Sequence, residues 1–190
     1  MSSNFTYQWH GLGDISRQSY TCGYCGKDVA PNHAYYTEHA RGAPASIYIC
    51  PHCQCPTFFG ADKKQTPGVR TGREVGGITD EGVRLLYDEA RDCAAAGCHT
   101  AAVLVCRKLL MHIATAHGAG EGLKFIEYVD YLRAKGFIPP NGDKWVDKIR
   151  TSGNEATHEI RIMAPAESQM IIGFVEMLLR FVFEFPSLVK

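Results

Sequence analysis

The chain has 190 residues, of which 45% are hydrophobic, and its 20 Lys and Arg residues balance 20 Asp and Glu residues. This length and apolar content predict a globular protein with one domain of ordinary size and a small additional module. The zero net charge excludes a basic surface that binds nucleic acid through many phosphate contacts, so any nucleic acid would have to meet a local patch.

Residues 4–10 alternate between aromatic and polar side chains, with Phe5, Tyr7 and Trp9 on one side. This alternation predicts a β-strand with one aromatic face. The strand either packs on another part of the protein or leaves its aromatic face free to stack on nucleic-acid bases. The N-terminal stretch has no basic region followed by an apolar one, so we expect no secretory signal and a cytoplasmic location.

Two Cys-x-x-Cys pairs dominate the N-terminal third of the chain. Each pair places two sulfurs on a tight turn, and two pairs supply the four ligands of a closed tetrahedral zinc site. The predicted ligands of one structural Zn²⁺ per chain are Cys22, Cys25, Cys50 and Cys53. Cys55 is an alternative to one member of the second pair, and His52 is a weaker one. Without an export signal or a thioredoxin-like pattern, metal-binding thiolates are favoured over disulfides or a redox-active pair.

Between the cysteine pairs, Ala34–Thr37 and Ser46–Ile49 are predicted as short strands around a turn at residues 42–44. Together with the cysteines they predict a small β zinc ribbon over residues 1–60. Some sixty residues bury little apolar surface, so metal binding, at roughly 10–16 kcal/mol in comparable peptides, would supply the missing stability.

Residues 61–78 are rich in Gly, Lys and Arg and show no apolar period, which predicts a linker or a long ordered loop. This segment holds the only basic cluster in the sequence, formed by Lys63, Lys64, Arg70 and Arg73. The cluster is either a solvated linker or an arm that contacts nucleic-acid phosphates.

Residues 79–190 are predicted to form an all-α domain. The expected helices run from Thr79 or Asp80 to Gly97, His99–Ala116, Glu121–Lys135, Asp143–Met163, and Pro165 to about Phe185, where Pro186 would end the last one. The second is apolar nearly all round and should be central. Cys93, Cys98 and Cys106 have helical spacing and are interpreted as small core residues.

The last of these helices is the most apolar part of the chain. Glu176, Arg180 and Glu184 interrupt it on one face, so it is too short and too charged to span a bilayer. Its apolar arc is wider than one packing partner needs, which predicts a homodimer.

The predicted helix Asp143–Met163 carries a column of polar side chains. Arg150, Asn154 and His158 are spaced one helical turn apart. A guanidinium, an amide and an imidazole in this arrangement either form a buried hydrogen-bond ladder or act on a phosphodiester. In the second case His158 moves protons and Arg150 binds the phosphate, and a two-fold dimer supplies a second histidine.

The segment IRTSGNEATHEI (149–160), followed by the apolar last helix, resembles the bacterial domain of unknown function 4145, which is similar to the HEPN superfamily of all-α domains. The resemblance covers about residues 79–190. It implies a HEPN-like helical bundle, and many HEPN members are dimeric, metal-independent ribonucleases of toxin and phage-defence systems. Their motif places an Arg and an adjacent polar residue four to six residues before a His. Asn154 and His158 fit the polar and His positions, whereas Gly153 precedes Asn154.

Two functions are therefore expected. The first is a zinc-binding HEPN-like module of bacterial defence or toxin type that binds RNA or a protein partner, with the polar column as a structural network. The alternative is a metal-independent endoribonuclease whose composite active site in a homodimer uses Arg150, Asn154 and His158.

Overall fold

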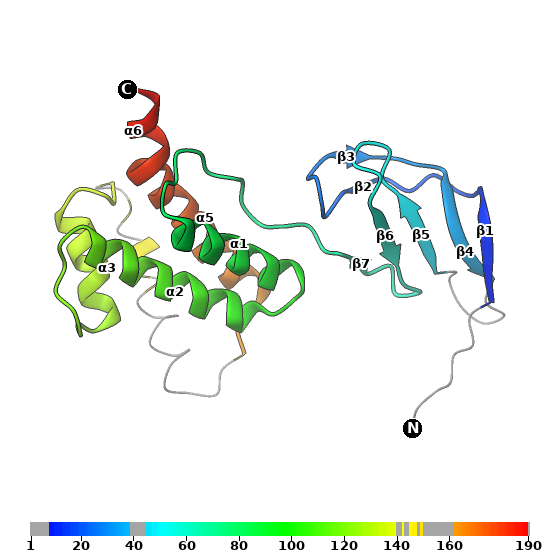
Figure 1. Ribbon diagram of the computed structural model, residues 1–190. Coiled ribbons are helices and arrows are strands. Elements are labelled where there is room, and N and C mark those ends of the chain that lie inside the picture. The colour runs from blue at the N-terminus through cyan, green and yellow to red at the C-terminus, as the bar shows by residue number, and fades with distance from the viewer. Residues whose placement is uncertain are drawn as a thin grey trace. The chain divides into compact units, whose positions relative to one another are not determined.

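The computed structural model describes residues 8–38, 45–139, 142, 145–147, 149 and 162–189. The chain divides into two compact units, Met1–Arg70 and Thr71–Lys190. We call them the β unit and the helical unit (Figure 1). An antiparallel sheet followed by helices confirms the predicted order of a β region and an α-helical region.

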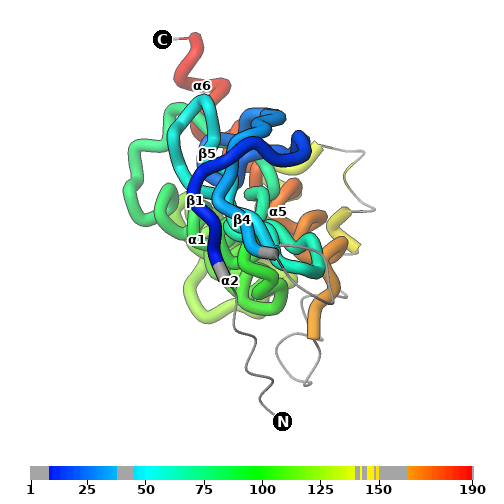
Figure 2. Tube along the Cα trace, turned by 90° about the vertical axis from the view of Figure 1, so that its right-hand side faces the viewer, coloured from blue at the N-terminus to red at the C-terminus, as the bar shows by residue number. Residues whose placement is uncertain are grey.

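The β unit contains a five-stranded antiparallel sheet in the order β1-β4-β5-β6-β7 and a two-stranded sheet formed by β2 and β3. The strands are β1 (Gln8–Asp14), β2 (Tyr20–Thr21), β3 (Asp28–Val29), β4 (His33–Glu38), β5 (Ser46–Ile49), β6 (Pro56–Phe59) and β7 (Gln65–Thr66). β1 runs beside β4 with a bulge between His10 and Gly13 (Figure 2). β4 and β5 contain the two predicted strands. The aromatic strand predicted at residues 4–10 is described only from Gln8, and it continues to Asp14.

The core of the β unit lies on the face of the large sheet where β2 packs. Strand register places Tyr48 and Phe59 on this face, and Tyr20 of β2 meets both rings. The ring centroids of Tyr20 and Phe59 are 5.1 Å apart, and those of Tyr48 and Phe59 are 5.9 Å apart. Cys22 and Cys50 are fully buried beside these rings. The cysteine turns therefore pack directly against the aromatic core of the β unit.

The helical unit is built from α1 (Glu81–Ala95), α2 (His99–Ala116), α3 (Phe125–Ala134), α5 (Pro165–Leu179), the π-helical segment η2 (Arg180–Glu184) and α6 (Phe185–Leu188). α2 packs against α1, α3 and α5. Its side chains Val103, Leu109, Leu110 and Ile113 are almost completely buried. The prediction of α2 as the central helix is confirmed, including both of its ends.

Two helix ends in this unit, the start of α1 and the end of α3, follow standard capping rules. The Asp80 side chain accepts a hydrogen bond from the backbone N–H of Val83 at the start of α1. At the end of α3, Gly136 has a φ of +79°, and the Phe137 N–H donates to the Leu132 carbonyl. This is the Schellman arrangement that the Gly136-Phe137 pair predicts. α3 itself begins at Phe125, four residues later than predicted.

The last helix differs from its prediction. Pro186 does not end it, because the backbone continues from α5 through η2 into α6, where Pro186 occupies the first turn. Proline is tolerated in a first turn since its missing N–H is not needed there. None of the helices in the part of the chain that the structure describes is long and apolar enough to cross a bilayer.

The predicted helix Asp143–Met163 lies mostly outside the described residues. Trp145–Asp147 and Ile149 are helical, whereas Ile162 and Met163 are not. The Met163 N–H instead donates to the Thr100 hydroxyl at 3.0 Å. The prediction was therefore wrong at its C-terminal end, because the chain there turns toward the start of α2.

The segment expected as a linker, residues 61–78, is shared between the two units. Its first part contains β7 and belongs to the β unit. Its second part is bound to the helices of the helical unit. Arg91 of α1 donates to the carbonyl oxygens of Thr71 and Gly72, and the Tyr87 hydroxyl donates to the Arg73 carbonyl.

Candidate metal centre

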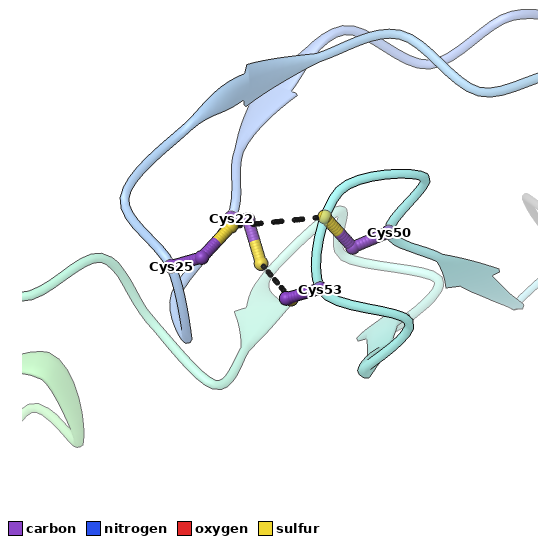
Figure 3. Close-up of side chains that lie close together, drawn as sticks. All are labelled: Cys22, Cys25, Cys50 and Cys53. Atoms are coloured by element: carbon purple, nitrogen blue, oxygen red, sulfur yellow. Dashed lines mark hydrogen bonds between the residues drawn. The ribbon is translucent and has the colours of Figure 1, made fainter.

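Two tight turns carry the cysteines of the candidate metal centre. The first cysteine turn, residues 22–27, connects β2 to β3, and the second, residues 50–55, connects β5 to β6. Each turn follows a strand of the β unit, and the packing of those strands brings the two turns together (Figure 3). The sequence spacing creates each turn, and the tertiary fold creates the cluster.

The two cysteine turns have the same backbone hydrogen bonds. Cys22 N–H donates to the Lys27 carbonyl, and Cys50 N–H donates to the Cys55 carbonyl. In each turn the residue after the second cysteine donates back to the carbonyl of the first. That residue is Gly26 with a φ of +66° in the first turn and Gln54 with a φ of +61° in the second.

The four sulfurs lie close enough to share one ion. All lie within 4.8 Å of one another. The Cys22 and Cys53 sulfurs are 3.7 Å apart, and those of Cys25 and Cys50 are 3.8 Å apart (Figure 3). A tetrahedral ion bound by four thiolates at about 2.3 Å separates its sulfurs by about 3.8 Å. The arrangement therefore fits a metal ion of that size without rearrangement of the turns.

The backbone of the second cysteine turn favours a thiolate. Burial raises the pKa of the Cys50 thiol, but hydrogen bonds from the backbone N–H groups of Cys53 and His52 and from the Cys53 and Cys22 thiols together lower it to about 7. For Cys53, the N–H of Cys55 favours the thiolate, whereas desolvation and the neighbouring cysteines raise its pKa overall. Four thiolates at these distances repel one another, and a bound cation would remove that repulsion.

The two alternative ligands do not join the cluster. Cys55 occupies the position that Lys27 has in the first turn, and its thiol contacts the Cys53 carbonyl at 3.6 Å. His52 lies at the exposed tip of the second turn. Among the described residues, the group placed to hold a metal consists of the four cysteines of the two turns.

A feature that the sequence analysis missed covers the first cysteine turn. The Gln65 side chain donates to the carbonyl oxygens of Thr21 at 2.9 Å and Pro67 at 3.1 Å. A Cβ atom at Gly23 would lie 2.6 Å from the carbonyl oxygens of Pro67 and Gly68. The backbone after β7 thus packs on the first turn, and only glycine fits at position 23.

The predicted basic cluster is divided by the fold. Lys63 and Lys64 lie exposed in the turn between β6 and β7, where the Lys63 N–H donates to the Gly60 carbonyl. Arg70 is the last residue of the β unit, and Arg73 belongs to the helical unit. The two lysines therefore belong to the β unit together with Arg70, and the role of the cluster as a phosphate-contacting arm stays a prediction.

The other predicted site residues fall elsewhere. Arg150, Asn154 and His158 lie outside the described residues. Of the three helical cysteines, Cys106 is fully buried and Cys93 is half-buried. Cys98 is exposed at the start of α2, so its interpretation as a core residue was wrong.

The fold and site define a class of protein with a β module that carries a four-cysteine cluster, followed by a helical domain. The chain belongs to the family described as Domain of unknown function (DUF4145), whose model matches residues 88–190. The match begins within α1 and leaves the β unit outside it. No curated protein and no solved structure matches the chain.

Proposed function

We propose that the protein is a binding module in which a structural Zn²⁺ holds the β unit folded and the helical unit joins two chains. The observation that carries this proposal is the convergence of two cysteine turns with sulfur separations of 3.7 and 3.8 Å. Zinc is the ion we favour because four thiolates in a tetrahedron are its usual structural ligand set. Such a site has no open position for a substrate.

Nucleic acid is the partner that we favour for this module. Charge divides unevenly between the units: residues 1–70 carry six Lys and Arg against four Asp and Glu, and residues 71–190 carry fourteen against sixteen. The β unit thus has a net charge of +2 and the helical unit −2. The β unit also exposes large aromatic side chains, including Trp9 and Tyr35. Positive charge attracts phosphates and exposed rings stack on bases. This surface therefore suits single-stranded nucleic acid better than it suits a protein partner.

An apolar groove along the last helix supports self-association of the helical unit. A pocket of about 350 Å³ is lined by Gly173, Met177, Phe181 and Phe185 together with Glu176 and Arg180. Phe181 and Phe185 remain nearly half exposed, and their rings meet edge to face at 5.3 Å. A second copy of the same helix is the occupant we propose, because a two-fold contact would bury these rings on both chains at once.

The zinc proposal is tested by elemental analysis of protein purified without added metal. We expect one zinc per chain, a Cys50→Ser variant that loses the metal, and a Cys55→Ser variant that keeps it. Loss of the metal should unfold the β unit and leave the helical unit folded, because metal binding supplies much of the stability of so small a module. A ratio well below one in the unaltered protein contradicts the proposal.

The ribonuclease alternative and the role in bacterial defence implied by the family resemblance remain predictions. The residues on which the ribonuclease depends lie outside the described part of the chain. Its test is therefore biochemical.

A further inference from the structure

One face of the large sheet in the β unit carries the aromatic side chains that the core does not use. Strand register places Tyr35, Ile47, Phe58 and Thr66 in one row on this face. Trp9 lies on the same face, because it pairs with Thr37, two residues along β4 from Tyr35. We call these five residues the aromatic face; it is opposite to the face that contacts β2.

The rings of the aromatic face are accessible. Trp9 is 43% exposed and Tyr35 is 42% exposed, and Phe58 is half-buried. The centroids of Trp9 and Phe58 lie 6.4 Å apart with an interplanar angle of 53°. Because Trp9 belongs to β1 and Phe58 to β6, these two rings lean toward each other across β4 and β5 and present a broad apolar platform.

Positive charge stands at the border of this platform. Lys64 pairs with Gly60 in the β6–β7 hairpin, so alternation along β7 places it on the same face as Thr66. Lys63 precedes it in the exposed turn. The Asp14 carboxylate at the end of β1 is 2.7 Å from the His33 imidazole. A protonated His33 offsets the negative charge of Asp14.

We propose that the aromatic face binds a single-stranded nucleic acid, with bases stacked on Trp9 and Tyr35 and the phosphate backbone passing Lys63 and Lys64. This inference rests on the proposed function and assigns its binding surface. Every base offers a planar face, so stacking on exposed rings is tolerant of sequence, and lysines at the border hold the backbone. A duplex hides its bases and should bind only through the two lysines.

The test uses the full zinc-loaded chain and a fluorescein-labelled oligouridine of about 12 nucleotides, within the length range that a small single-strand-binding domain covers. Fluorescence anisotropy measures affinity at low and physiological salt. We expect Trp9→Ala and Tyr35→Ala each to weaken binding at least about fivefold, and Lys64→Gln to reduce the salt dependence. Zinc content and the circular dichroism spectrum establish that each variant is folded.

A matched control is Tyr24, which is 54% exposed in the first cysteine turn and does not belong to the aromatic face; Tyr24→Ala should bind as the unaltered protein does. A direct readout is also available, because the chain has two tryptophans. In a Trp145→Phe background, stacking should quench the fluorescence of Trp9.

The outcomes separate the two proposals. If the zinc-loaded chain binds the oligonucleotide but Trp9→Ala and Tyr35→Ala bind equally well, the aromatic face is wrong and the binding function stands. The other outcome is that the zinc-loaded chain fails to bind the oligonucleotide at a protein concentration of about 100 μM, which is far above the dissociation constants of most specific complexes. That result overturns both the aromatic face as a binding surface and nucleic acid as the partner.

Discussion

Gly26 and Gln54 occupy equivalent positions in the two cysteine turns, and both have a left-handed backbone. Glycine adopts this conformation without strain, whereas a side chain costs roughly 1–2 kcal/mol in the left-handed region. The second turn therefore stores backbone strain that the first turn avoids. Because folding of the β unit is expected to depend on the metal, this strain in the folded state should lower the metal affinity.

We expect Gln54→Gly to increase the apparent zinc affinity by up to about fivefold, equivalent to about 1 kcal/mol. Gly26→Ala should weaken it by a similar factor. Competition with a chelator of known affinity measures both effects. Gln54→Ala is the matched control, because it removes the side-chain hydrogen bond to the Pro51 carbonyl and keeps the strained backbone. Weaker zinc binding by Gln54→Gly would show that the side chain matters more than the backbone.

His158 remains the residue on which the ribonuclease alternative depends. If Arg150, Asn154 and His158 form a buried ladder, as we expect, His158→Ala leaves polar partners unsatisfied and should cost roughly 1–3 kcal/mol of stability. Thermal melts of the unaltered protein and this variant measure the cost, with Glu159→Ala as a neighbouring control.

A different result would favour the enzyme. An active ribonuclease of this kind leaves 2′,3′-cyclic phosphate ends on RNA, and these ends should disappear with His158→Ala. If the variant also melts at or above the temperature of the unaltered protein, His158 lines a substrate cleft and the ladder interpretation fails.

The four-cysteine cluster was predictable from the sequence, whereas the place of Cys55 was not. Two Cys-x-x-Cys pairs determine which sulfurs share a turn, and the structure brings all four together. The status of Cys55 could not be read in the same way, because it depends on the conformation of the second turn. Cys55 matches Lys27 in the two hydrogen-bond patterns, and its thiol donates to the Cys53 carbonyl, which separates it from the cluster.

Among the elements, α1 has a titratable cap. The Asp80 carboxylate accepts from the Val83 N–H and lies 3.4 Å from the His112 imidazole. The hydrogen bond from Val83, followed by the contact with His112, holds the pKa of Asp80 below its usual value. A carboxyl whose pKa is depressed in the folded state stabilises above its unfolded pKa, about 3.9, and loses that contribution as pH falls through its folded pKa.

We therefore expect Asp80→Ala to lower the Tm of the helical unit at pH 7. Asp80→Asn keeps a cap that does not titrate, so its Tm should fall less than that of the unaltered protein between pH 5 and pH 2. Far-UV circular dichroism melts follow the helices. Glu89→Gln, an exposed carboxylate of the same helix, serves as the control and should leave the pH dependence unchanged. Parallel pH profiles for Asp80→Asn and the unaltered protein would contradict this prediction.

α2 and the short strand β5 were predictable with their bounds, whereas β6, β7 and the continuation past Pro186 were not. α2 has an apolar surface nearly all round and clear ends, so its bounds follow from the sequence. β6 begins with a proline and has two adjacent phenylalanines, and β7 has only two residues, so neither shows an alternating pattern. The continuation past Pro186 depends on the π-helical segment η2, where Arg180 binds the carboxylates of Glu176 and Glu184. The four-residue spacing of these contacts follows from helical periodicity, whereas the π-helical backbone at Arg180–Glu184 does not.

At the scale of the whole molecule, the apolar groove of the last helix predicts a dimer. Light scattering at micromolar concentration should give about twice the chain mass of 21.0 kDa. Phe181→Glu places a charge among the groove residues and should give a monomer, because an unpaired charge is costly to bury. Leu85→Glu is the control: Leu85 is exposed on α1, away from the groove. A monomeric unaltered protein would overturn the dimer and, with it, the composite active site of the ribonuclease alternative.

The contacts between the β7 region and the first cysteine turn have a practical consequence for dissecting this protein. The second cysteine turn ends at Cys55, which suggests a cut near residue 60, yet Gln65, Pro67 and Gly68 lie against the first turn. A fragment that stops at residue 60 would expose the backbone around Gly23 to water and should exchange its metal faster than a fragment that runs to Arg70. The smallest piece of the β unit that keeps the four-cysteine cluster covered is therefore set by the chain that packs on the first cysteine turn and not by the four cysteines alone.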